Sequence, residues 1–428
     1  MEYRKVSVVG LGYIGLPTAA VFAANGVEVC GVDVNPYIVD EINRGKIHIV
    51  EPGLEDIVSK CVASGLLKAS LNAEQSDAFV IAVPTPFNAE REPDLSYIKK
   101  AIEMIAPRLE CGNLIVLEST SPVGTTETLV EWLKDLRPDL NFPEPSTSGD
   151  VFIAYCPERV LPGRVLEELV MNPRIIGGIS DDCSTEAVTL YKSFLKSDCT
   201  TTNARTAELC KLTENSSRDV NIAFANELSL ICDELCVNVW ELISLANKHP
   251  RVNILKPGPG VGGHCIAVDP WFIISSTPEI SKIIKTARLI NDGKPQWVIE
   301  KVLKVSENYR LDKSVSFGQK VRIACLGLSF KADIDDLRES PALEITNHLS
   351  GIEGLEIMAV EPNIGKSCSR LHPQATLVSF IDAVKKADIF LLLVDHEEFK
   401  CADPLLFEGK PMIDTRGIYS GVIEVNSL

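Results

Sequence analysis

The 428-residue sequence has no apolar run approaching the roughly 18–20 residues that a membrane-spanning helix requires. It begins MEYRKVSVVGLG, which leads directly into a strand-like segment, and we expect no signal peptide. Basic residues are scarce: 42 Lys and Arg stand against 59 Asp and Glu, and the net charge is −17. Such a chain repels phosphate-rich surfaces, which argues against a nucleic-acid or membrane partner. We therefore expect a cytoplasmic protein, in which a small anionic ligand would need a local cluster of Lys and Arg.

Metal-binding cysteine patterns are also missing. None of the thirteen cysteines forms a C-x-x-C pair or a Cys/His ligand cluster, so the sequence predicts no metal site. Cys232 and Cys236 are four residues apart but lack the further ligands that zinc requires. Most free cysteines in a reducing compartment are small apolar packing residues. Cys265 differs, because it lies in the glycine-rich segment GVGGHCIAVD (260–269).

The first half of the chain alternates strand and helix patterns. KVSVVGLG (5–12) and VEVCGVDVN (27–35) read as strands, and IGLPTAAVFAANG (14–26) between them has helical spacing. SDAFVIAVPTP (76–86) and NLIVLESTSP (113–122) read as further buried parallel strands. This alternation predicts a doubly wound α/β domain with a parallel sheet.

The rest of the chain predicts a helical section and a second sheet. Residues 206–235 contain no Gly or Pro and carry apolar residues at helical spacing, which predicts one long helix. KVRIACLGLSFK (320–331) then resembles the opening strand and turn, although it lacks the full glycine pattern, so we expect a ligand other than a dinucleotide there. We predict an α/β protein with two Rossmann-like domains, over 1–202 and 311–428, joined by a helical, dimerising section over 203–310.

A dinucleotide fingerprint follows the first strand. Gly10, Gly12 and Gly15 have the G-x-G-x-x-G spacing that permits a tight turn and close approach of a pyrophosphate to a helix N-terminus. Asp33 ends the next strand, where a carboxylate accepts hydrogen bonds from a ribose 2′-hydroxyl and repels a 2′-phosphate. The combination predicts NAD as the cofactor.

Polar groups follow other strands at the carboxyl edge of the first sheet, where such folds bind ligands. Thr85 in VPTP and Thr120 and Thr126 in ESTSPVGTT supply hydroxyls there, although turn formation and helix capping explain each of them equally well. On the long helix, Lys211, Asn215 and Arg218 are spaced i, i+4 and i+7 and share one face. That face is either solvated or an anion-binding, catalytic surface.

Cys265 has four possible roles: zinc ligand, redox thiol, packing residue or nucleophile. Its loop, PGPGVGGHC, excludes regular structure and presents backbone N–H groups that can cradle phosphates and activate a thiol. A packing residue needs no such loop, zinc needs more ligands, and a redox pair needs a nearby second cysteine. Beside a dinucleotide site, a nucleophile that traps an aldehyde for a second hydride transfer fits best.

Motifs along nearly the whole chain resemble the nucleotide-sugar 6-dehydrogenases related to UDP-glucose dehydrogenase. They are GLGYIGLP, GVDVN, EPGL, VPTP, ESTSPVGTT, PERVLPG, ELCKLTEN, GPGVGGHCIAVDP, GLSFKADIDDLRESP and DTRG. Within that family, HPRVNILKPGPGVGGHCIAVDPWF is similar to the members that act on UDP-N-acetyl-D-mannosamine. UDP-glucose members typically have Ser in place of His264 and lack Pro270.

The resemblance implies a four-electron oxidation of a sugar C6 alcohol to a carboxylate with two NAD. It implies that Cys265 is the nucleophile, that Lys211 with Asn215 stabilises oxyanion charge, and that Asp269 assists proton transfer. Glu158 and Thr120 would handle the water that hydrolyses the final thioester.

The resemblance also assigns the ligand contacts. Those to NAD would come from Tyr13, Ile14, Asp33, Thr85, Thr126 and Arg338. Those to the UDP-sugar would come from Arg159, Val160, Lys211, Asn215, Arg218, His249, Arg251, Gly262, Phe330, Lys331 and Arg416. The family's equivalent of Arg251 comes from a partner subunit, which implies a homo-oligomer, a dimer or larger.

Three alternatives stay open. The sugar could be UDP-GlcNAc, UDP-GalNAc or UDP-glucose. A non-catalytic NAD-binding regulator would have no need of Cys265, Lys211 and Glu158 together. A two-electron dehydrogenase that stops at the aldehyde or a ketone would have no need of the nucleophile.

Overall fold

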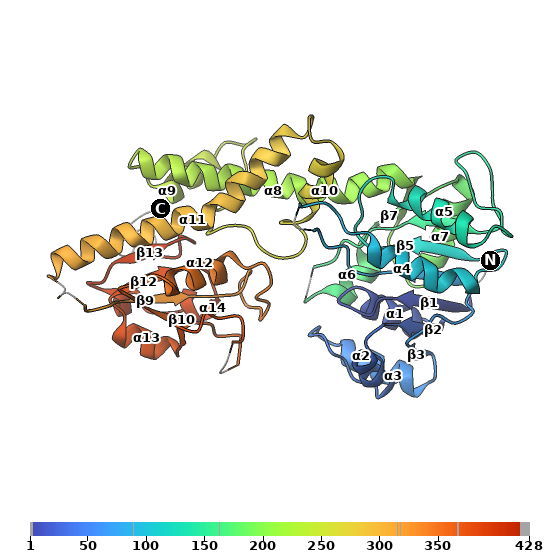
Figure 1. The fold of residues 1–428 in the computed structure, drawn as a ribbon, viewed down its shortest axis with the longest axis horizontal. Coiled ribbons are helices and arrows are strands. Elements are labelled where there is room, and N and C mark those ends of the chain that lie inside the picture. The colour runs from blue at the N-terminus through green and yellow to red at the C-terminus, as the bar shows by residue number, and fades with distance from the viewer. Residues whose placement is uncertain are drawn as a thin grey trace. The chain divides into compact units, whose positions relative to one another are not determined.

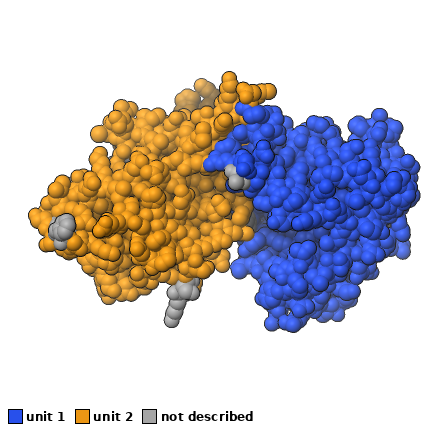
Figure 2. All heavy atoms as spheres, viewed as in Figure 1, with its two compact units in different colours: residues 1–214, 271–278 blue, residues 215–270, 279–428 orange. Residues whose placement is uncertain are grey.

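The computed structural model describes residues 3–88, 90–161, 163–314, 316, 318–365 and 368–419, so Pro162 of the PERVLPG motif lies outside the described residues. The chain forms two compact units (Figure 2). Unit 1 comprises residues 1–214 and 271–278, and unit 2 comprises residues 215–270 and 279–428. In the described part of the chain, no helix is both long enough and apolar enough to cross a membrane.

Unit 1 contains an eight-stranded sheet in the order β3-β2-β1-β4-β5-β6-β7-β8 (Figure 1). All neighbouring strands are parallel except β6 and β7, which are antiparallel. The strands are β1 (Lys5–Val9), β2 (Glu28–Val32), β3 (Leu67–Ser70), β4 (Ala78–Ile81), β5 (Leu114–Leu117), β6 (Phe152–Tyr155), β7 (Arg174–Gly178) and β8 (Cys199–Asn203). The order reverses between β1 and β4, which is the position where doubly wound sheets bind ligands.

Helices cover both faces of this sheet. One apolar core joins it to α1 (Gly15–Ala24), α2 (Pro36–Asn43), α3 (Leu54–Ala63), α6 (Val165–Met171) and α7 (Asp181–Tyr191). A second core joins its other face to α4 (Ser96–Ile105), the 3₁₀ turn η1 (Ala106–Arg108) and α5 (Thr125–Leu136). The central strands β4 and β5 are apolar throughout because both of their faces are buried, as is usual for parallel sheets, whereas the edge strand β8 is polar and largely exposed.

Two helices of 31 residues, α8 (Ala204–Glu234) and α11 (Lys282–Asp312), form most of the helical section, with α9 (Val239–Ala246) and α10 (Asp269–Ser276) between them. Buried polar pairs hold α8 against α11. Arg288 pairs with Asp219 at 2.5 Å, and Lys294 donates to Ser229 at 2.6 Å. The long helix expected at 206–235 is therefore confirmed.

Unit 2 contains a five-stranded parallel sheet in the order β11-β10-β9-β12-β13. Its strands are β9 (Val321–Leu326), β10 (Leu355–Val360), β11 (Thr376–Leu377), β12 (Ile389–Leu392) and β13 (Met412–Asp414). One face packs on α11 and α12 (Pro341–Ser350), and the other on α13 (Phe380–Lys386), α14 (Glu397–Lys400) and η2 (Pro404–Phe407). Two Rossmann-like sheets with a helical middle section confirm the predicted fold class.

Candidate functional site

The turn after β1 has the geometry that its glycines require. Gly10 has a φ of +93°, and a Cβ there would lie 2.6 Å from the carbonyl oxygen of Ala82. A Cβ on Gly15 would overlap the carbonyl oxygen of Gly10, so folding itself demands both glycines. A Cβ on Gly12 would meet nothing within 4 Å. Since the fold leaves open space at Gly12, this turn fits the close approach of a pyrophosphate.

Asp33 follows β2 and faces the same turn. One carboxylate oxygen accepts a hydrogen bond from Leu11 N at 3.0 Å, and the other accepts one from Asn35 N at 2.9 Å. Tyr13 and Ile14 immediately precede α1, whose first turn carries no acidic side chain and whose Ile14 cap makes no side-chain hydrogen bond. The positive end of the α1 dipole is therefore left for an anion.

Two of the three predicted threonines have clear partners in unit 1. The Thr85 hydroxyl donates to the carbonyl oxygen of Thr120 at 2.5 Å, which ties the loop after β4 to the loop after β5. Thr126 is fully buried, and its hydroxyl and N–H both donate to Glu208 at 2.6 and 2.8 Å. Glu208 also accepts from Gly124 N and so caps α5. Thr126 of the ESTSPVGTT motif therefore has a structural role: it binds Glu208, a capping residue 82 positions away in the sequence.

Glu158 lies just after β6 and is 9% exposed. Its Oε2 pairs with the buried guanidinium of Arg174 at 2.9 Å, and its Oε1 accepts a hydrogen bond from Arg159 N at 2.6 Å. The carboxylate is therefore held on both oxygens. The Arg159 side chain pairs with Glu214 at 3.0 Å, and Val160 packs against the first core.

Helix α8 carries three of the predicted residues. Lys211 and Asn215 are half-buried one turn apart, and Arg218 is exposed. Asn215 Nδ2 donates to Asp269 Oδ2 at 2.5 Å, so two residues 54 positions apart form a direct pair in unit 2. Asp269 is 3% exposed and is the first residue of α10. This pair agrees with the catalytic set that the resemblance implies.

Cys265 is exposed at a tight turn leading into α10. Its carbonyl oxygen accepts hydrogen bonds from Val268 N at 3.1 Å and from Asp269 N at 2.9 Å. These bonds fix the cysteine relative to the Asn215–Asp269 pair through the backbone of one turn. None of the thirteen cysteines, all of them within the described residues, is in a disulfide, and Cys265 differs from the buried ones in being exposed.

The glycines before Cys265 allow close packing on the C-terminal sheet's loops. A Cβ on Gly263 would lie 2.9 Å from the Phe330 ring, and one on Gly262 would lie 2.9 Å from Phe330 Cβ. A Cβ on Gly258 would lie 2.6 Å from an Arg416 guanidinium nitrogen. Unit 2 thus brings Phe330 against Gly262 and Arg416 against Gly258 of the same loop, and Gly262, Phe330 and Arg416 are all predicted to bind the sugar nucleotide.

Sequence reasoning missed the residue that anchors this loop. Asn226 on α8 accepts a hydrogen bond from Gly258 N at 2.9 Å, and its amide donates to Asn291 on α11 at 2.8 Å. Asn291 in turn donates to Asp219 at 2.8 Å, and Arg288 pairs with the same carboxylate. These hydrogen bonds could not be predicted from the sequence, because Asn226 is there only one polar residue inside an apolar helical pattern.

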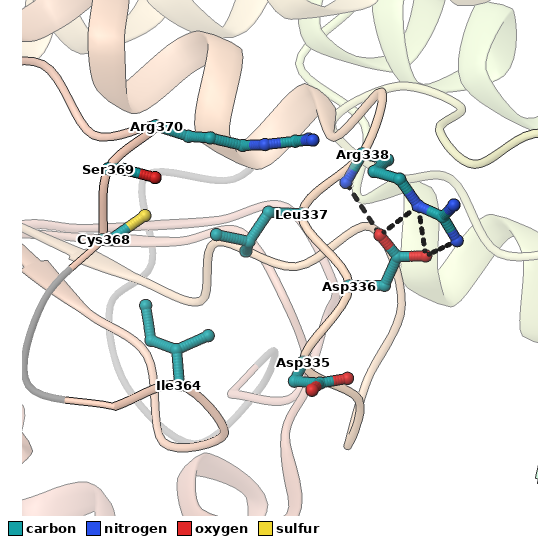
Figure 3. Close-up of a pocket in the computed structure, with 8 residues that line it drawn as sticks. All are labelled: Asp335, Asp336, Leu337, Arg338, Ile364, Cys368, Ser369 and Arg370. Atoms are coloured by element: carbon teal, nitrogen blue, oxygen red, sulfur yellow. Dashed lines mark hydrogen bonds and ion pairs between the residues drawn. The ribbon is translucent and has the colours of Figure 1, made fainter. Parts of the chain in front are cut away.

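Arg338 lies in the loop after β9 and lines a cavity of about 310 Å³ in unit 2 (Figure 3). Its guanidinium pairs with Asp336 at 2.7 Å, and the figure shows the two side chains facing one another. Burial, together with the Arg338 charge, lowers the pKa of His264. The cavity is lined by Asp335, Asp336, Leu337, Arg338, Ile364, Cys368, Ser369 and Arg370.

The other predicted sugar contacts are exposed. His249 accepts a hydrogen bond from Arg251 N at 3.3 Å in the turn after α9, and Lys331 follows Phe330. Among the described residues, no group of three or more His, Cys, Asp or Glu side chains is placed to hold a metal ion.

The sequence matches the UDP-glucose/GDP-mannose dehydrogenase family in three parts. Residues 4–195 match its NAD binding domain, 205–293 its central domain and 324–421 its UDP binding domain. UDP-N-acetyl-D-mannosamine dehydrogenase from Yersinia pestis is 54% identical over 98% of this chain and 100% of its own. NDP-N-acetyl-D-galactosaminuronic acid dehydrogenase from Ralstonia nicotianae is also 54% identical, over 98% of this chain and 97% of its own.

Among solved structures, the UDP-D-ManNAc dehydrogenase from Pyrococcus horikoshii is similar with a TM-score of 0.85 and 36% identity, covering 99% of this chain and 98% of that one. These matches confirm the predicted family, the dehydrogenase activity and NAD as the cofactor. They also confirm a UDP-sugar as the class of substrate. The chain is a member of the UDP-glucose/GDP-mannose dehydrogenase family.

Proposed function

We propose that this dehydrogenase oxidises UDP-N-acetyl-D-mannosamine at C6 to UDP-N-acetyl-D-mannosaminuronate. The observation that carries the choice of sugar is that six relatives, each 53–54% identical over 98% of this chain, are all named UDP-N-acetyl-D-mannosamine dehydrogenase. The overall change converts a primary alcohol, water and two NAD⁺ into a carboxylate, two NADH and three protons. NAD, when bound, supplies the hydride acceptor for each of the two oxidations.

Cys265 is the proposed nucleophile. Its sulfur adds to the C6 aldehyde to give a thiohemiacetal, whose oxidation leaves a thioester on the enzyme. The exposed position of Cys265 at a turn supports this role. Lys211 and Asn215 stabilise the negative oxygen that forms at C6, and the Asn215–Asp269 hydrogen bond orients the amide. Asp269 assists proton transfer.

Glu158 is the proposed base for the last step. A water adds to the acyl carbon, the C–S bond breaks, Cys265 leaves as a thiolate, and a proton of the water passes to Glu158. Thr120 positions this water. The two contacts that fix the Glu158 carboxylate support the role, because a base must hold one orientation.

The ligand contacts follow the same assignment. We propose that Gly10, Gly12, Gly15, Tyr13, Ile14, Asp33, Thr85 and Arg338 serve NAD. Thr126, expected among them, is left out because it is fully buried and both its hydroxyl and its N–H donate to Glu208. Arg159, Val160, Arg218, Gly262, Phe330, Lys331 and Arg416 serve the UDP-sugar, with His249 and Arg251 acting on the site of a neighbouring copy. Arginine and lysine in this set would offset the net charge of −17 when a dianionic diphosphate binds.

A homo-oligomer of at least two chains is part of this proposal. Exposed apolar residues on α8, Phe224 and Ile231, are seven positions apart and share a face, which suits a second copy. We also propose a cytoplasmic location, which thirteen free cysteines support because reducing compartments keep thiols unpaired. We also propose that the chain divides into three functional parts: an NAD-binding domain over 1–202, a helical, dimerising section over 203–310 and a UDP-sugar-binding domain over 311–428.

A competing sugar has one specific observation in its favour, since the Ralstonia relative of equal identity carries a galactosaminuronate name. The test is kcat/KM on UDP-ManNAc, UDP-GlcNAc, UDP-GalNAc and UDP-glucose, with the product of each identified by mass. We expect UDP-ManNAc to exceed the others by at least about tenfold, since a misplaced polar substituent costs at least about 1.4 kcal/mol. Equal rates on UDP-ManNAc and UDP-GalNAc would reject the choice.

A further inference from the structure

A buried ion network lies behind Glu158 in unit 1. Arg174, the first residue of β7, is 4% exposed and contacts two carboxylates. Its Nη2 donates to Glu158 Oε2 at 2.9 Å and its Nη1 donates to Glu118 Oε1 at 3.4 Å. Glu118 follows β5 and has a fully buried side chain. Neither Glu118 nor Arg174 belongs to the residues that sequence reasoning selected.

Aromatic and sulfur groups complete the surroundings of Arg174. Its guanidinium lies 4.5 Å from the ring centroid of Tyr191 and 5.7 Å from that of Phe194. The Tyr191 hydroxyl, on α7, donates to Glu118 Oε1 at 2.6 Å. Cys156 Sγ, just after β6, lies 3.6 Å from Arg174 Nη1. Four elements of the fold therefore hold this guanidinium in one place.

Such a network needs a reason beyond stability. Replacing a buried ion group with apolar side chains of similar size is often neutral or stabilising, because desolvating charges is costly. Here two carboxylates share one guanidinium inside a core that is otherwise apolar. The two carboxylates are Glu118 and Glu158, and of these we assign a role in thioester hydrolysis only to Glu158.

We propose that Arg174, held by Glu118 and Tyr191, is a positioning residue that orients Glu158 for hydrolysis of the thioester on Cys265. This proposal rests on the proposed function. The step it serves is the addition of water to the acyl carbon, with loss of the Cys265 thiolate and transfer of a water proton to Glu158. No electrons leave the substrate in this step, and we expect the two preceding oxidations to proceed without the network.

Glu118 gives this step a pH dependence. Burial raises the pKa of Glu118 to about 7, and Arg174 partly offsets the rise. Three further titratable groups lie at the network: burial raises the pKa of Cys156 to about 12, and it also raises the pKa values of Tyr191 on α7 and Cys199 on β8. Glu118 is ionised above about pH 7 and neutral below it, so the strength of its contact with Arg174 Nη1 changes across this pH, while Nη2 stays with Glu158.

The test follows the acyl-enzyme itself by intact-mass spectrometry after mixing with UDP-ManNAc and NAD and quenching in acid. Arg174→Lys keeps the charge but loses the fork that reaches both carboxylates. We expect it to slow deacylation by roughly 100-fold, at the low end of what a positioned base contributes. The mass of the acyl group should then accumulate on Cys265. Arg322→Lys, at the Arg322–Asp388 pair of the second sheet, is the matched control and should show no adduct.

Glu118→Gln tests the same network without removing the Arg174–Glu158 pair. We expect deacylation at wild-type rates near pH 6 and a flat deacylation profile through pH ~7, where the wild-type profile inflects because Glu118 titrates. If Arg174→Lys fails to fold, this profile decides alone. A folded Arg174→Lys enzyme without accumulated adduct, or a Glu118→Gln profile identical to wild type, would overturn the proposal.

Glu158→Gln separates failure of the network from failure of the proposed function. If this variant accumulates the adduct and Arg174→Lys does not, the network is wrong and the function stands. If Glu158→Gln also forms no adduct on Cys265, the assigned chemistry itself fails.

Discussion

Gly10 in the turn after β1 and Gly327 in the turn after β9 share a φ of +93°. Each packs against the residues that follow the neighbouring strand, Ala82 after β4 and Val394 after β12, and leaves no room for a Cβ. In each sheet the next strand, β2 or β10, ends in an acidic residue whose side chain accepts a hydrogen bond from a backbone N–H of the turn. The two sheets therefore begin with the same construction.

The acidic residues are used differently. Asp33 is half-buried and accepts hydrogen bonds from two backbone N–H groups. Glu361 has a fully buried side chain that accepts from Leu328 N at 2.7 Å and Ser329 N at 3.0 Å and pairs with His396 at 3.0 Å. The second carboxylate is thus buried and bonded by the protein, whereas the first stays half-buried, and we propose that it accepts a ribose hydroxyl.

The segments after the two turns differ as well. Helix α1 begins at Gly15, directly after the first turn, whereas α12 begins at Pro341, and the residues between Ser329 and α12 form an irregular loop. Only the first of these two turns leads directly into a helix N-terminus, where an anion is favoured. The glycine turn is thus a structural unit of both sheets, and we propose that an open Gly12, a helix start and an accessible carboxylate make the first one a dinucleotide site.

The largest effect that separates the two sheets should come from Glu361→Gln. Loss of a buried charged partner should destabilise unit 2 by about 3 kcal/mol while leaving the Kd for NAD within about twofold. Hydrogen exchange of the β9 and β10 amides measures the first effect, and calorimetric titration with NAD measures the second. Weaker NAD binding in this variant would mean that the second sheet takes part in the cofactor site.

Gly12→Val, in the first sheet, should change the free energy of NAD binding by nearly as much as Glu361→Gln changes the stability of unit 2. Because a Cβ there meets no protein atom within 4 Å, the melting temperature should stay close to wild type. Branched atoms in the open space should nevertheless raise the Kd for NAD by roughly 100-fold, or about 2.7 kcal/mol. Ser329→Ala, at the corresponding position of the second turn, serves as the control and should leave NAD binding unchanged. Normal NAD affinity in Gly12→Val would reject the open-glycine argument.

Asp33→Asn should have a smaller effect. Loss of the charge that accepts the ribose hydroxyl should weaken NAD binding about tenfold, which is about 1.4 kcal/mol, and should reduce discrimination against NADP. The ratio of the two dissociation constants is the measurement. An unchanged NAD/NADP ratio would show that Asp33 serves only the turn.

The smallest effect is a pH dependence of unit 2. Burial alone would raise the pKa of Glu361, but the hydrogen bonds from His396 and Leu328 N outweigh it and hold that pKa below its ordinary value. A lowered folded-state pKa contributes stability above the unfolded value and loses it as pH falls through the folded value. The β9 amides should exchange more slowly in wild type than in Glu361→Gln, and this difference should therefore decrease below about pH 4.5. A difference in exchange rate that stays constant down to pH ~3 would contradict this assignment.

Sequence patterns predicted those parts of the site that depend on local spacing. The glycine turn at Gly10, the one-turn separation of Lys211 and Asn215 and the irregular loop before Cys265 follow from residues close in the chain. The partners of Glu158 and Gly258 could not be predicted in this way. Arg174 meets Glu118 across 56 residues and Asn226 meets Gly258 across 32, and only the packing of strands and helices creates those contacts.

NADH yield per sugar tests most directly whether Cys265 holds the aldehyde as a thiohemiacetal for the second oxidation. With limiting UDP-ManNAc and excess NAD, wild-type enzyme should form two NADH per sugar, because water completes the reaction as a carboxylate. Cys265→Ala should bind NAD normally, as calorimetry would verify, and should not reach two NADH. Two NADH per sugar from the alanine variant would contradict the covalent mechanism.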